Sequence, residues 1–165
     1  MIIKITLHTE HRRETYASTW EEALQYVYYQ INSWAGINNF SSESIAEDIS
    51  SIKIARNHFS EGALKELDIN TFVGNYFKIE RLKATESNER IFDYLWKYRS
   101  RNGINNGWVN KMDIKEELNI AEDGTIVGTM IGFIKKDIAE RLDFPLPDGK
   151  VFKYYRIKRE HVYSR

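Results

Sequence analysis

The stretch FPLPDGKVFKYYRIKR, at positions 144–159, decides how the last part of the chain folds. Its Pro147-Asp148-Gly149 segment favours a tight turn, because glycine supplies the positive φ that such turns need. The residues that follow alternate apolar or aromatic side chains with basic ones, which is typical of a strand. The stretch therefore predicts a β-hairpin with Lys150 at its tip.

The second strand of this hairpin has two faces, and both carry cations and aromatic rings. One face would hold Val151, Lys153, Tyr155, Ile157 and Arg159, and the other Phe152, Tyr154, Arg156 and Lys158. Two interpretations stay open. The strand is either a lysine-bearing edge strand that resists aggregation, or a strand directed at the phosphates of a nucleic acid. On the second interpretation the phosphate contacts come from Lys150, Lys153, Arg156 and Lys158.

Three helices are predicted before the hairpin. NERIFDYLWKYRSRNG (88–103) has apolar residues at helical spacing, and KMDIKEELNI (111–120) predicts a short second helix. After the turn AEDG, the stretch TIVGTMIGFIKKDIAERL (125–142) predicts a longer helix. Its apolar stripe would comprise Val127, Met130 or Ile131, Ile134, Ile138 and Leu142.

The order helix, short strand, helix, turn, longer helix and hairpin is that of a winged helix-turn-helix. The segment WVNKMDIKEELNI followed by EDGTIVGTMIGFIKK resembles that superfamily. The resemblance lies in an Asp-Ile-x-x-Glu-Leu second helix, a turn that ends in Ile and a third helix that opens with Thr, and it covers about residues 87–160. It implies a DNA-binding domain whose third helix enters the major groove.

The resemblance places the exposed face of the third helix against DNA. That face would hold Thr125, Gly128, Thr129, Gly132, Lys135 and Lys136. The threonines and lysines suit DNA contact, but no Arg, Asn or Gln is placed for a bidentate base contact. Glu122 and Asp123, just before the helix, would repel phosphates. Gly128 and Gly132 would instead offer a smooth surface to a second helix.

The first half of the chain predicts a small α+β domain. IIKITLH (2–8) predicts a strand, and EHRRETY (10–16) predicts a connector. STWEEALQYVYYQINSW (18–34) predicts an amphipathic helix, in which Ser18 caps the N-terminus and pairs with Glu21 in a capping box. A second helix is predicted at about 42–52, and a strand at 70–82.

The whole chain is therefore predicted to be α+β, with two domains. An α+β domain at 1–83 and a winged-helix-like domain at 90–165 would be joined by a polar linker at 84–89. In the first domain Tyr26, Tyr28 and Tyr29 point in different directions around one helix, so at least one should reach the surface. Exposed tyrosines are typical of protein interfaces.

Composition narrows the classes of function. The chain has 24 basic and 24 acidic residues, so no global field draws it to nucleic acid or to an anionic membrane. The absence of cysteine fits a reducing compartment, and we expect a cytoplasmic protein. No stretch approaches the roughly 18 apolar residues of a membrane span. The 20 isoleucines against 9 leucines indicate an AT-rich coding sequence, such as that of a low-GC bacterium or of its phages and plasmids.

The sequence gives little support to an enzyme. His8, Glu10 and His11 lack the HExxH spacing of a zinc site, and on a strand His11 would leave the face that His8 and Glu10 share. Glycine-rich phosphate loops and nucleophile elbows are absent from the sequence. We therefore expect no catalytic activity, no metal and no cofactor.

Two functional hypotheses remain. The first is a DNA-binding regulator or accessory protein of a mobile element, whose first half contacts a protein or forms a homodimer. The second keeps the winged helix but directs it at a protein, as in a phage inhibitor of a host nucleic-acid-processing protein of the anti-CRISPR or anti-defence type. A continuous basic strip over the third helix and the hairpin would favour DNA, whereas cations flanked by acidic residues would favour a protein partner.

Overall fold

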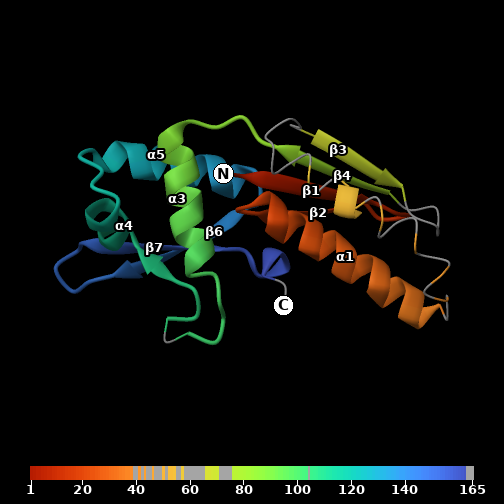
Figure 1. Cartoon of the computed structure of the whole chain (residues 1–165). Coiled ribbons are helices and arrows are strands. Elements are labelled where there is room, and N and C mark those ends of the chain that lie inside the picture. Colours follow the sequence, from red (N-terminus) through yellow and green to blue (C-terminus); the bar gives the residue numbers. More distant parts are fainter. Residues whose placement is uncertain are drawn as a thin grey trace. The chain divides into compact units, whose positions relative to one another are not determined.

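The computed structural model of the chain describes residues 1–38, 41, 43, 46, 50, 52–54, 57, 66–70, 76–103 and 105–162. The chain divides into two compact units, Met1–Lys83 and Ala84–Arg165 (Figure 1). Helices and sheets are both present, so the chain belongs to the α+β class.

The first unit contains an antiparallel sheet with the strand order β2-β1-β4-β3. Its strands are β1 (Ile3–His8), β2 (Arg13–Ala17), β3 (Glu66–Asn70) and β4 (Tyr76–Arg81). Side chains alternate between the two faces of a strand, and one face of this sheet carries the buried Ile3, Ile5, Leu7, Phe77 and Ile79.

Helix α1 (Trp20–Ile37) packs against the first unit's sheet (Figure 1). Its buried stripe consists of Ala23, Leu24, Val27, Ile31 and Ala35. The ring of Trp34 also stacks on Phe77, with the ring centroids 5.5 Å apart. The helix was therefore predicted correctly, and its apolar stripe covers the apolar face of the sheet.

The N-terminal cap of α1 lies one residue later than predicted. Thr19 is the N-cap, and its hydroxyl accepts a hydrogen bond from the backbone amide of Glu22 at 3.1 Å. The Glu22 carboxylate in turn accepts from the amide of Ser18 at 3.1 Å. The reciprocal logic of the capping box is present, but Thr19 and Glu22 provide it in place of Ser18 and Glu21.

The first unit differs from the prediction in the segment between β1 and α1. The predicted connector at 10–16 contains strand β2, which pairs with β1 from Leu7 opposite Arg13 to Ile3 opposite Ala17. The connector prediction is wrong there, because pairing with an apolar neighbour stabilises a polar strand of low intrinsic preference. The predicted second helix, at about 42–52, lies largely outside the described residues.

The second unit contains three helices and an antiparallel sheet. In chain order these elements are α3 (Glu86–Lys97), β5 (Val109–Asn110), α4 (Lys111–Glu117), α5 (Asp123–Lys135), β6 (Ala139–Pro145) and β7 (Val151–Ile157), followed by a short 3-10 helix, η1 (Arg159–His161). The strand order is β5-β7-β6. Helix α3 begins inside the predicted linker at 84–89, because the hydroxyl of Thr85 caps it by accepting from the amide of Asn88 at 3.2 Å.

The core of the second unit lies between its helices and one face of its sheet. Phe92 of α3 is fully buried, and its ring centroid is 5.5 Å from that of Trp96 and 6.1 Å from that of Phe133 on α5. Tyr155 and Ile157 of β7 are buried on the face of the sheet that contacts the helices. The sheet therefore has an inner face, which is part of the core, and an outer face.

The predicted long helix at 125–142 ends at Lys135, so that part of the prediction is wrong. Asp137 adopts a left-handed φ of 63°. Its amide donates to the carbonyl of Ile134 at 3.0 Å, and the amide of Ile138 donates to the carbonyl of Phe133 at 2.9 Å. These two bonds form a Schellman motif, which ends α5 and turns the chain into β6.

The predicted hairpin at the end of the chain is confirmed. The amide of Gly149 donates to the carbonyl of Leu146 at 3.0 Å, and the amide of Leu146 donates to the carbonyl of Lys150 at 2.8 Å. Gly149 has a φ of 81°, a value that glycine adopts without the steric cost of a Cβ atom. The tip therefore spans residues 146–150 and joins β6 to β7.

Candidate functional site

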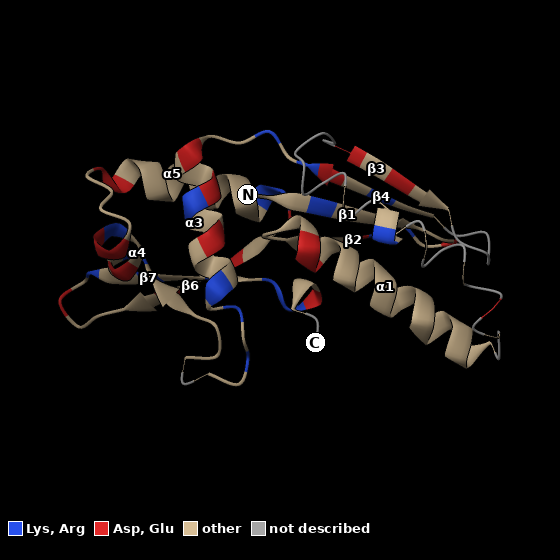
Figure 2. Cartoon of the chain, viewed as in Figure 1, with Lys and Arg blue, Asp and Glu red and all other residues tan. Residues whose placement is uncertain are grey.

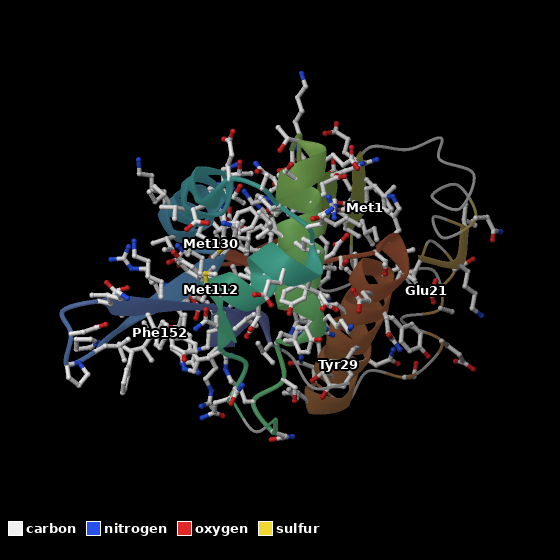
Figure 3. All side chains as sticks on the ribbon, turned by 90° about the vertical axis from the view of Figure 1, so that its left-hand side faces the viewer. Met1, Glu21, Tyr29, Met112, Met130 and Phe152 are labelled. Atoms are coloured by element: carbon white, nitrogen blue, oxygen red, sulfur yellow. The ribbon has the colours of Figure 1, made fainter. Side chains whose placement is uncertain are left out.

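The outer face of the second unit's sheet carries exposed apolar side chains where a solvated face is expected to carry polar ones. Leu142 of β6 lies opposite Tyr154 of β7, and Phe144 lies opposite Phe152. Leu142, Phe144 and Phe152 are 43%, 56% and 42% exposed, respectively. Figure 3 shows the hairpin projecting from the helices of its own unit, with Phe152 on the projecting part.

A shallow cavity of about 250 Å³ lies on this face. It is lined by Asn105, Trp108, Leu142, Phe144 and Tyr154. Trp108 comes from the loop that precedes β5, so residues far apart in the sequence form one apolar surface. We call the set Trp108, Leu142, Phe144, Phe152 and Tyr154 the aromatic face.

Two arginines join the Trp108 loop to the sheet through hydrogen bonds. Arg101 donates to the carbonyls of Ile157 at 2.5 Å and Asn106 at 3.2 Å, and Arg156 donates to the same Asn106 carbonyl at 3.1 Å. The guanidinium of Arg156 also lies over the Trp108 ring, 4.1 Å from its centroid. Because these contacts hold the indole in place, the aromatic face is preorganised.

Gly107 allows this arrangement. Its φ is 82°, and a Cβ atom at this position would lie 2.4 Å from a guanidinium nitrogen of Arg101. Burial is the main cause that lowers the pKa of Arg101, with the nearby Arg156 as the second cause. Glu140, whose carboxylate lies 3.7 Å from Arg101 and 2.6 Å from Arg156, compensates the two positive charges.

Two of the four hairpin cations predicted to contact phosphates, Arg156 and Lys158, are engaged within the fold. Arg156 pairs with Glu140 and stacks on Trp108, as described above. Lys158 pairs with Asp137, and it also lies 3.5 Å from Glu160. Lys153 of β7 lies opposite Asp143 of β6, and Lys150 at the exposed tip has Asp148 3.6 Å away. Figure 2 shows basic and acidic residues interspersed over this unit.

Helix α5 does not present the face that the DNA hypothesis requires. Thr129 is only 8% exposed, and its hydroxyl donates to the side-chain oxygen of Asn88 at 2.7 Å. Its assignment as a DNA contact is therefore wrong, because it joins α5 to α3 inside the unit. Thr125 is half-buried, and Lys135 and Lys136 are exposed at the C-terminal end of the helix.

The two glycines assigned to a helix interface are open. A Cβ atom built on Gly128 or Gly132 would meet no atom within 4 Å. The exposed Ile131 lies between them. This part of α5 is therefore small and apolar, and it offers no hydrogen-bonding side chain for reading bases.

Asp123, predicted to repel phosphates, instead joins two helices. Its carboxylate accepts from the ammonium groups of Lys111 at 2.7 Å and Lys115 at 2.6 Å. These hydrogen bonds lower the pKa of Asp123 to about 2. The carboxylate also lies in the first turn of α5, where the helix dipole favours a negative charge. One acidic residue thus compensates two lysines that would otherwise face solvent.

The three tyrosines of α1 that were predicted to point in different directions differ in their exposure. Tyr29 is 59% exposed on α1 (Figure 3), and Tyr28 is also exposed. Tyr26 is half-buried, and burial raises its pKa. At least one tyrosine of the predicted protein interface therefore reaches the surface of the first unit.

The described residues contain no group of three or more His, Cys, Asp or Glu side chains that could hold a metal ion. His8, considered above as a ligand, stacks on Tyr76 with the ring centroids 4.1 Å apart. A helix of the length and hydrophobicity needed to cross a bilayer is likewise absent from the described part of the chain.

Comparison of the chain with protein-family models, with curated proteins and with solved structures finds no match.

Proposed function

We propose that the second unit is a winged-helix module that binds a protein partner through its aromatic face. Two features support the winged-helix interpretation. The elements follow the order α3, β5, α4, α5, β6 and β7. The short strand β5 joins the hairpin in a sheet of order β5-β7-β6.

The observation that carries the proposal is the exposed apolar face of the hairpin. Exposing Phe144 and Phe152 to water has an unfavourable hydration free energy, which a partner that covers both rings would relieve. Buried aromatic side chains contribute much of the free energy at protein interfaces. The rigid support of Trp108 by Arg156 also lowers the conformational entropy that binding would cost.

The pattern of charge favours a protein over DNA. Binding to duplex DNA draws its affinity from cations that release counterions from phosphates. In this unit Lys111, Lys115, Arg156 and Lys158 have carboxylate partners. These pairs replace the continuous basic strip that DNA binding would need with a mixed, locally neutral surface.

The partner surface that fits this face is mainly apolar at its centre and polar at its rim. The centre would cover Phe144, Phe152 and Tyr154. At the rim, the Glu140–Arg156 pair and the side chain of Asn110 offer hydrogen-bonding groups. Such an arrangement of an apolar centre and a polar rim is typical of protein interfaces.

The broader role follows the second sequence hypothesis. We propose that the chain acts without catalysis, as a protein encoded by a phage or another mobile element that binds a nucleic-acid-processing protein of its host. Its cysteine-free composition fits the cytoplasm, which is part of the same proposal. The exposed tyrosines of α1 would provide a second contact region.

Site-specific photocrosslinking in bacterial cells tests the proposal. A photoreactive phenylalanine analogue at position 144 should capture a discrete partner, whereas the same analogue at Lys136, which is exposed on another part of the unit, should not. The captured protein is then purified and titrated with the wild-type chain by calorimetry. We expect at least a tenfold loss of affinity for the Phe144→Ser/Phe152→Ser variant, because burial of the two rings contributes several kcal/mol.

The competing DNA hypothesis is tested on the same protein. Fluorescence anisotropy with random duplex DNA, at low and at moderate salt, should show no salt-sensitive binding. Binding that a Lys150→Glu/Lys153→Glu variant abolishes, with the aromatic variant unaffected, would reject the protein proposal and place the hairpin on phosphates.

A further inference from the structure

Strand β6 forms one edge of the second unit's sheet. Within the described residues it pairs with β7 alone, because β7 lies in the middle of the order β5-β7-β6. The opposite edge of β6 therefore carries backbone groups that have no strand partner in the sheet. Such an edge is a template for pairing with another strand.

Two hydrogen bonds determine which residues face that free edge. The amide of Lys158 donates to the carbonyl of Ile138, and the amide of Leu146 donates to the carbonyl of Lys150. Hydrogen-bonding residues alternate along an antiparallel strand, so the even-numbered residues from 138 to 146 direct their backbone groups at β7. The odd-numbered residues Ala139, Arg141 and Asp143 direct theirs away from β7, and Pro145 adds a carbonyl.

We propose that this edge pairs with β6 of a second copy of the chain, antiparallel and about a two-fold axis through Leu142. Within one chain Arg141 and Asp143 form an ion pair at 3.0 Å. In this register Arg141 would also lie opposite Asp143 of the second copy, and Asp143 opposite its Arg141. Opposite charges in directly opposed positions stabilise a strand pair, and like charges destabilise it. The sequence of this edge is therefore complementary to itself.

The neighbouring registers are less favourable. A two-fold axis through Arg141 would place Arg141 opposite Arg141 of the second copy. An axis through Asp143 would place two aspartates opposite each other. Both arrangements bring like charges together. The axis through Leu142 instead places two leucines against each other, each 43% exposed in the isolated chain. Both the charges and the apolar side chains therefore select the same register.

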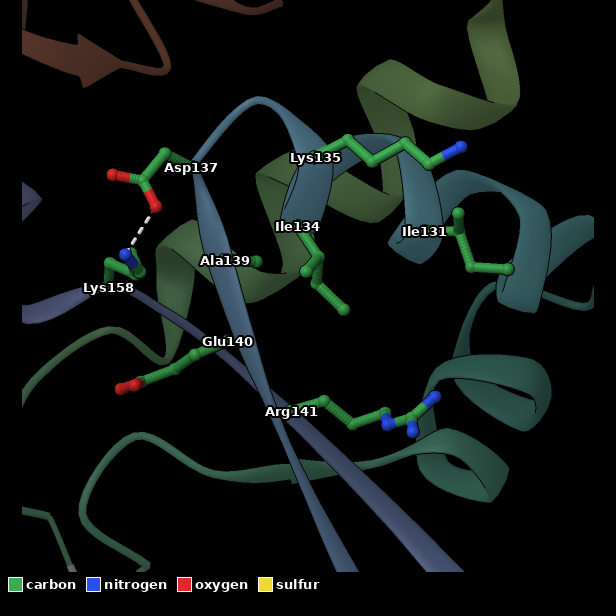
Figure 4. A pocket seen from close by; sticks show the side chains of 8 residues that line it. All are labelled: Ile131, Ile134, Lys135, Asp137, Ala139, Glu140, Arg141 and Lys158. Carbon is green, nitrogen blue, oxygen red and sulfur yellow. Dashed lines mark hydrogen bonds and ion pairs between the residues drawn. The ribbon is translucent and has the colours of Figure 1, made fainter.

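A cavity at the start of the edge leaves room for the second copy. It has a volume of about 510 Å³ and lies between α5 and β6 (Figure 4). Ile131 and Ile134 supply an apolar wall, and the lining also contains side chains of both charges, Lys135, Arg141 and Lys158 beside Asp137 and Glu140. The proposed register places Pro145 of the second copy opposite Ala139, so the turn that follows would enter this cavity. Asp148 in that turn would bring a carboxylate towards Lys135, whereas Lys158 is already paired with Asp137.

The dimer goes beyond the proposed function, because it forms at the edge of β6, which shares only Leu142 and Phe144 with the aromatic face. Pairing through the β6 edges would join two sheets into one of six strands. Directly opposed residues of an antiparallel pair lie on the same side of the sheet, so the aromatic faces of the two copies would form one continuous surface. A dimer would therefore present its partner with two equivalent sites.

Charge reversal tests the register on the full chain. At about 100 µM, where even a micromolar interface is populated, sedimentation equilibrium should give the mass of two chains. The variants Arg141→Asp and Asp143→Arg should each sediment at half that mass, because each places like charges opposite one another. An equimolar mixture of the two should restore the dimer as a heterodimer, and the double swap Arg141→Asp/Asp143→Arg should restore a homodimer.

Each contrary outcome is informative. A monomeric wild type at this concentration would overturn the proposal, and single reversals that remain dimeric, or a mixture that remains monomeric, would overturn the register. The Phe152→Ser variant separates the two proposals, since the ring lies on β7 and on the aromatic face. Loss of the dimer in that variant would move the dimer contact to the aromatic face. If the Phe152→Ser variant loses partner binding but still dimerises, the dimer contact remains at the β6 edge. Circular dichroism checks that each variant is folded.

Discussion

The two antiparallel sheets of this chain differ most in the faces that they turn away from their helices. In the first unit that face carries cross-strand ion pairs, with Lys4 of β1 3.0 Å from Glu14 of β2 and Lys78 of β4 3.7 Å from Glu66 of β3. In the second unit the corresponding face carries Phe144 and Phe152. Both sheets have an apolar inner face, so the difference concerns the surface and not the folding pattern.

A strand face that contacts water normally carries polar side chains. Where such a face carries large apolar side chains instead, a role in binding is the first explanation to test. A sheet with one face on its core and one in water should alternate apolar and polar residues, as the first unit's sheet does. The second sheet departs from that rule in its projecting half. The exposure of those two rings is the reason that we propose a binding surface there.

The largest effects on stability should come from substitutions in the cores of the two units. Phe77→Ala in the first unit and Phe92→Ala in the second should each lower the free energy of unfolding by about 3–5 kcal/mol, because both rings are fully buried and a cavity would remain. Hydrogen exchange resolved by segment should show lost protection mainly in the unit that carries the substitution. Equal loss in both units would show that they unfold together and would weaken the comparison.

Gly107→Ala should produce the next largest effect. The added Cβ atom would meet the Arg101 guanidinium at 2.4 Å and would also be strained at a φ of 82°. We expect a loss of about 1–3 kcal/mol, together with a change in Trp108 fluorescence as the loop shifts. Gly149→Ala is the matched control, because its φ of 81° is similar and its surroundings are open. If Gly149→Ala lowers the free energy of unfolding by as much, the whole effect of Gly107→Ala is due to backbone strain and not to contact with Arg101.

Acid should weaken the link between α4 and α5. The pKa of Asp123 is lowered from 3.8 to about 2 by hydrogen bonds from Lys111 and Lys115. A lowered pKa means that this carboxylate stabilises the fold above pH 3.8, and that the contribution is lost as the pH falls towards 2. The Asp123→Asn variant should therefore lose less stability than the wild type across that interval in urea titrations. Asp113→Asn, which makes the same change on α4 instead of α5, should keep the wild-type dependence.

The smallest effect on stability should come from the aromatic face itself. Phe152→Ser should lower the free energy of unfolding by about 1 kcal/mol, well below the loss for Phe92→Ala, because Phe152 is 42% exposed in the folded chain and Phe92 is fully buried. Thermal unfolding measured by circular dichroism checks this. A loss comparable to that of Phe92→Ala would mean that the ring belongs to the core, and the contrast between the two sheets would fail.

Much of the architecture was accessible from the sequence, and the failures have identifiable causes. The helix α1 and the turn at Gly149 follow from local patterns, and both were predicted correctly. The end of α5 was missed because Ile138 and Leu142 lie four residues apart. That spacing keeps two side chains on one face in a helix and in a strand alike. The change from helix to strand depends on the left-handed φ of Asp137, which the pattern of apolar residues does not reveal.

The candidate site was harder to predict for a related reason. With residues 139–142 assigned to a helix, Leu142 had no strand partner, and its pairing with Tyr154 could not be foreseen. The alternation of Leu142 and Phe144 with charged residues was the available signal. The partners of Asp123 and Thr129 depend on the packing of separate helices, so their roles required the structure.

The register of the first sheet has a kinetic consequence. Strand β1 pairs with β4 so that Ile3 lies beside Arg81, and closing so long a loop has an entropy cost that slows folding. The β6–β7 hairpin closes across a short tip and should form within roughly microseconds. On the ribosome, β1 has to wait for β4 to emerge before it can pair. During that interval Ile3 and Ile5 are available to chaperones, so the early strands of the chain should depend more on cellular folding assistance than the late hairpin does.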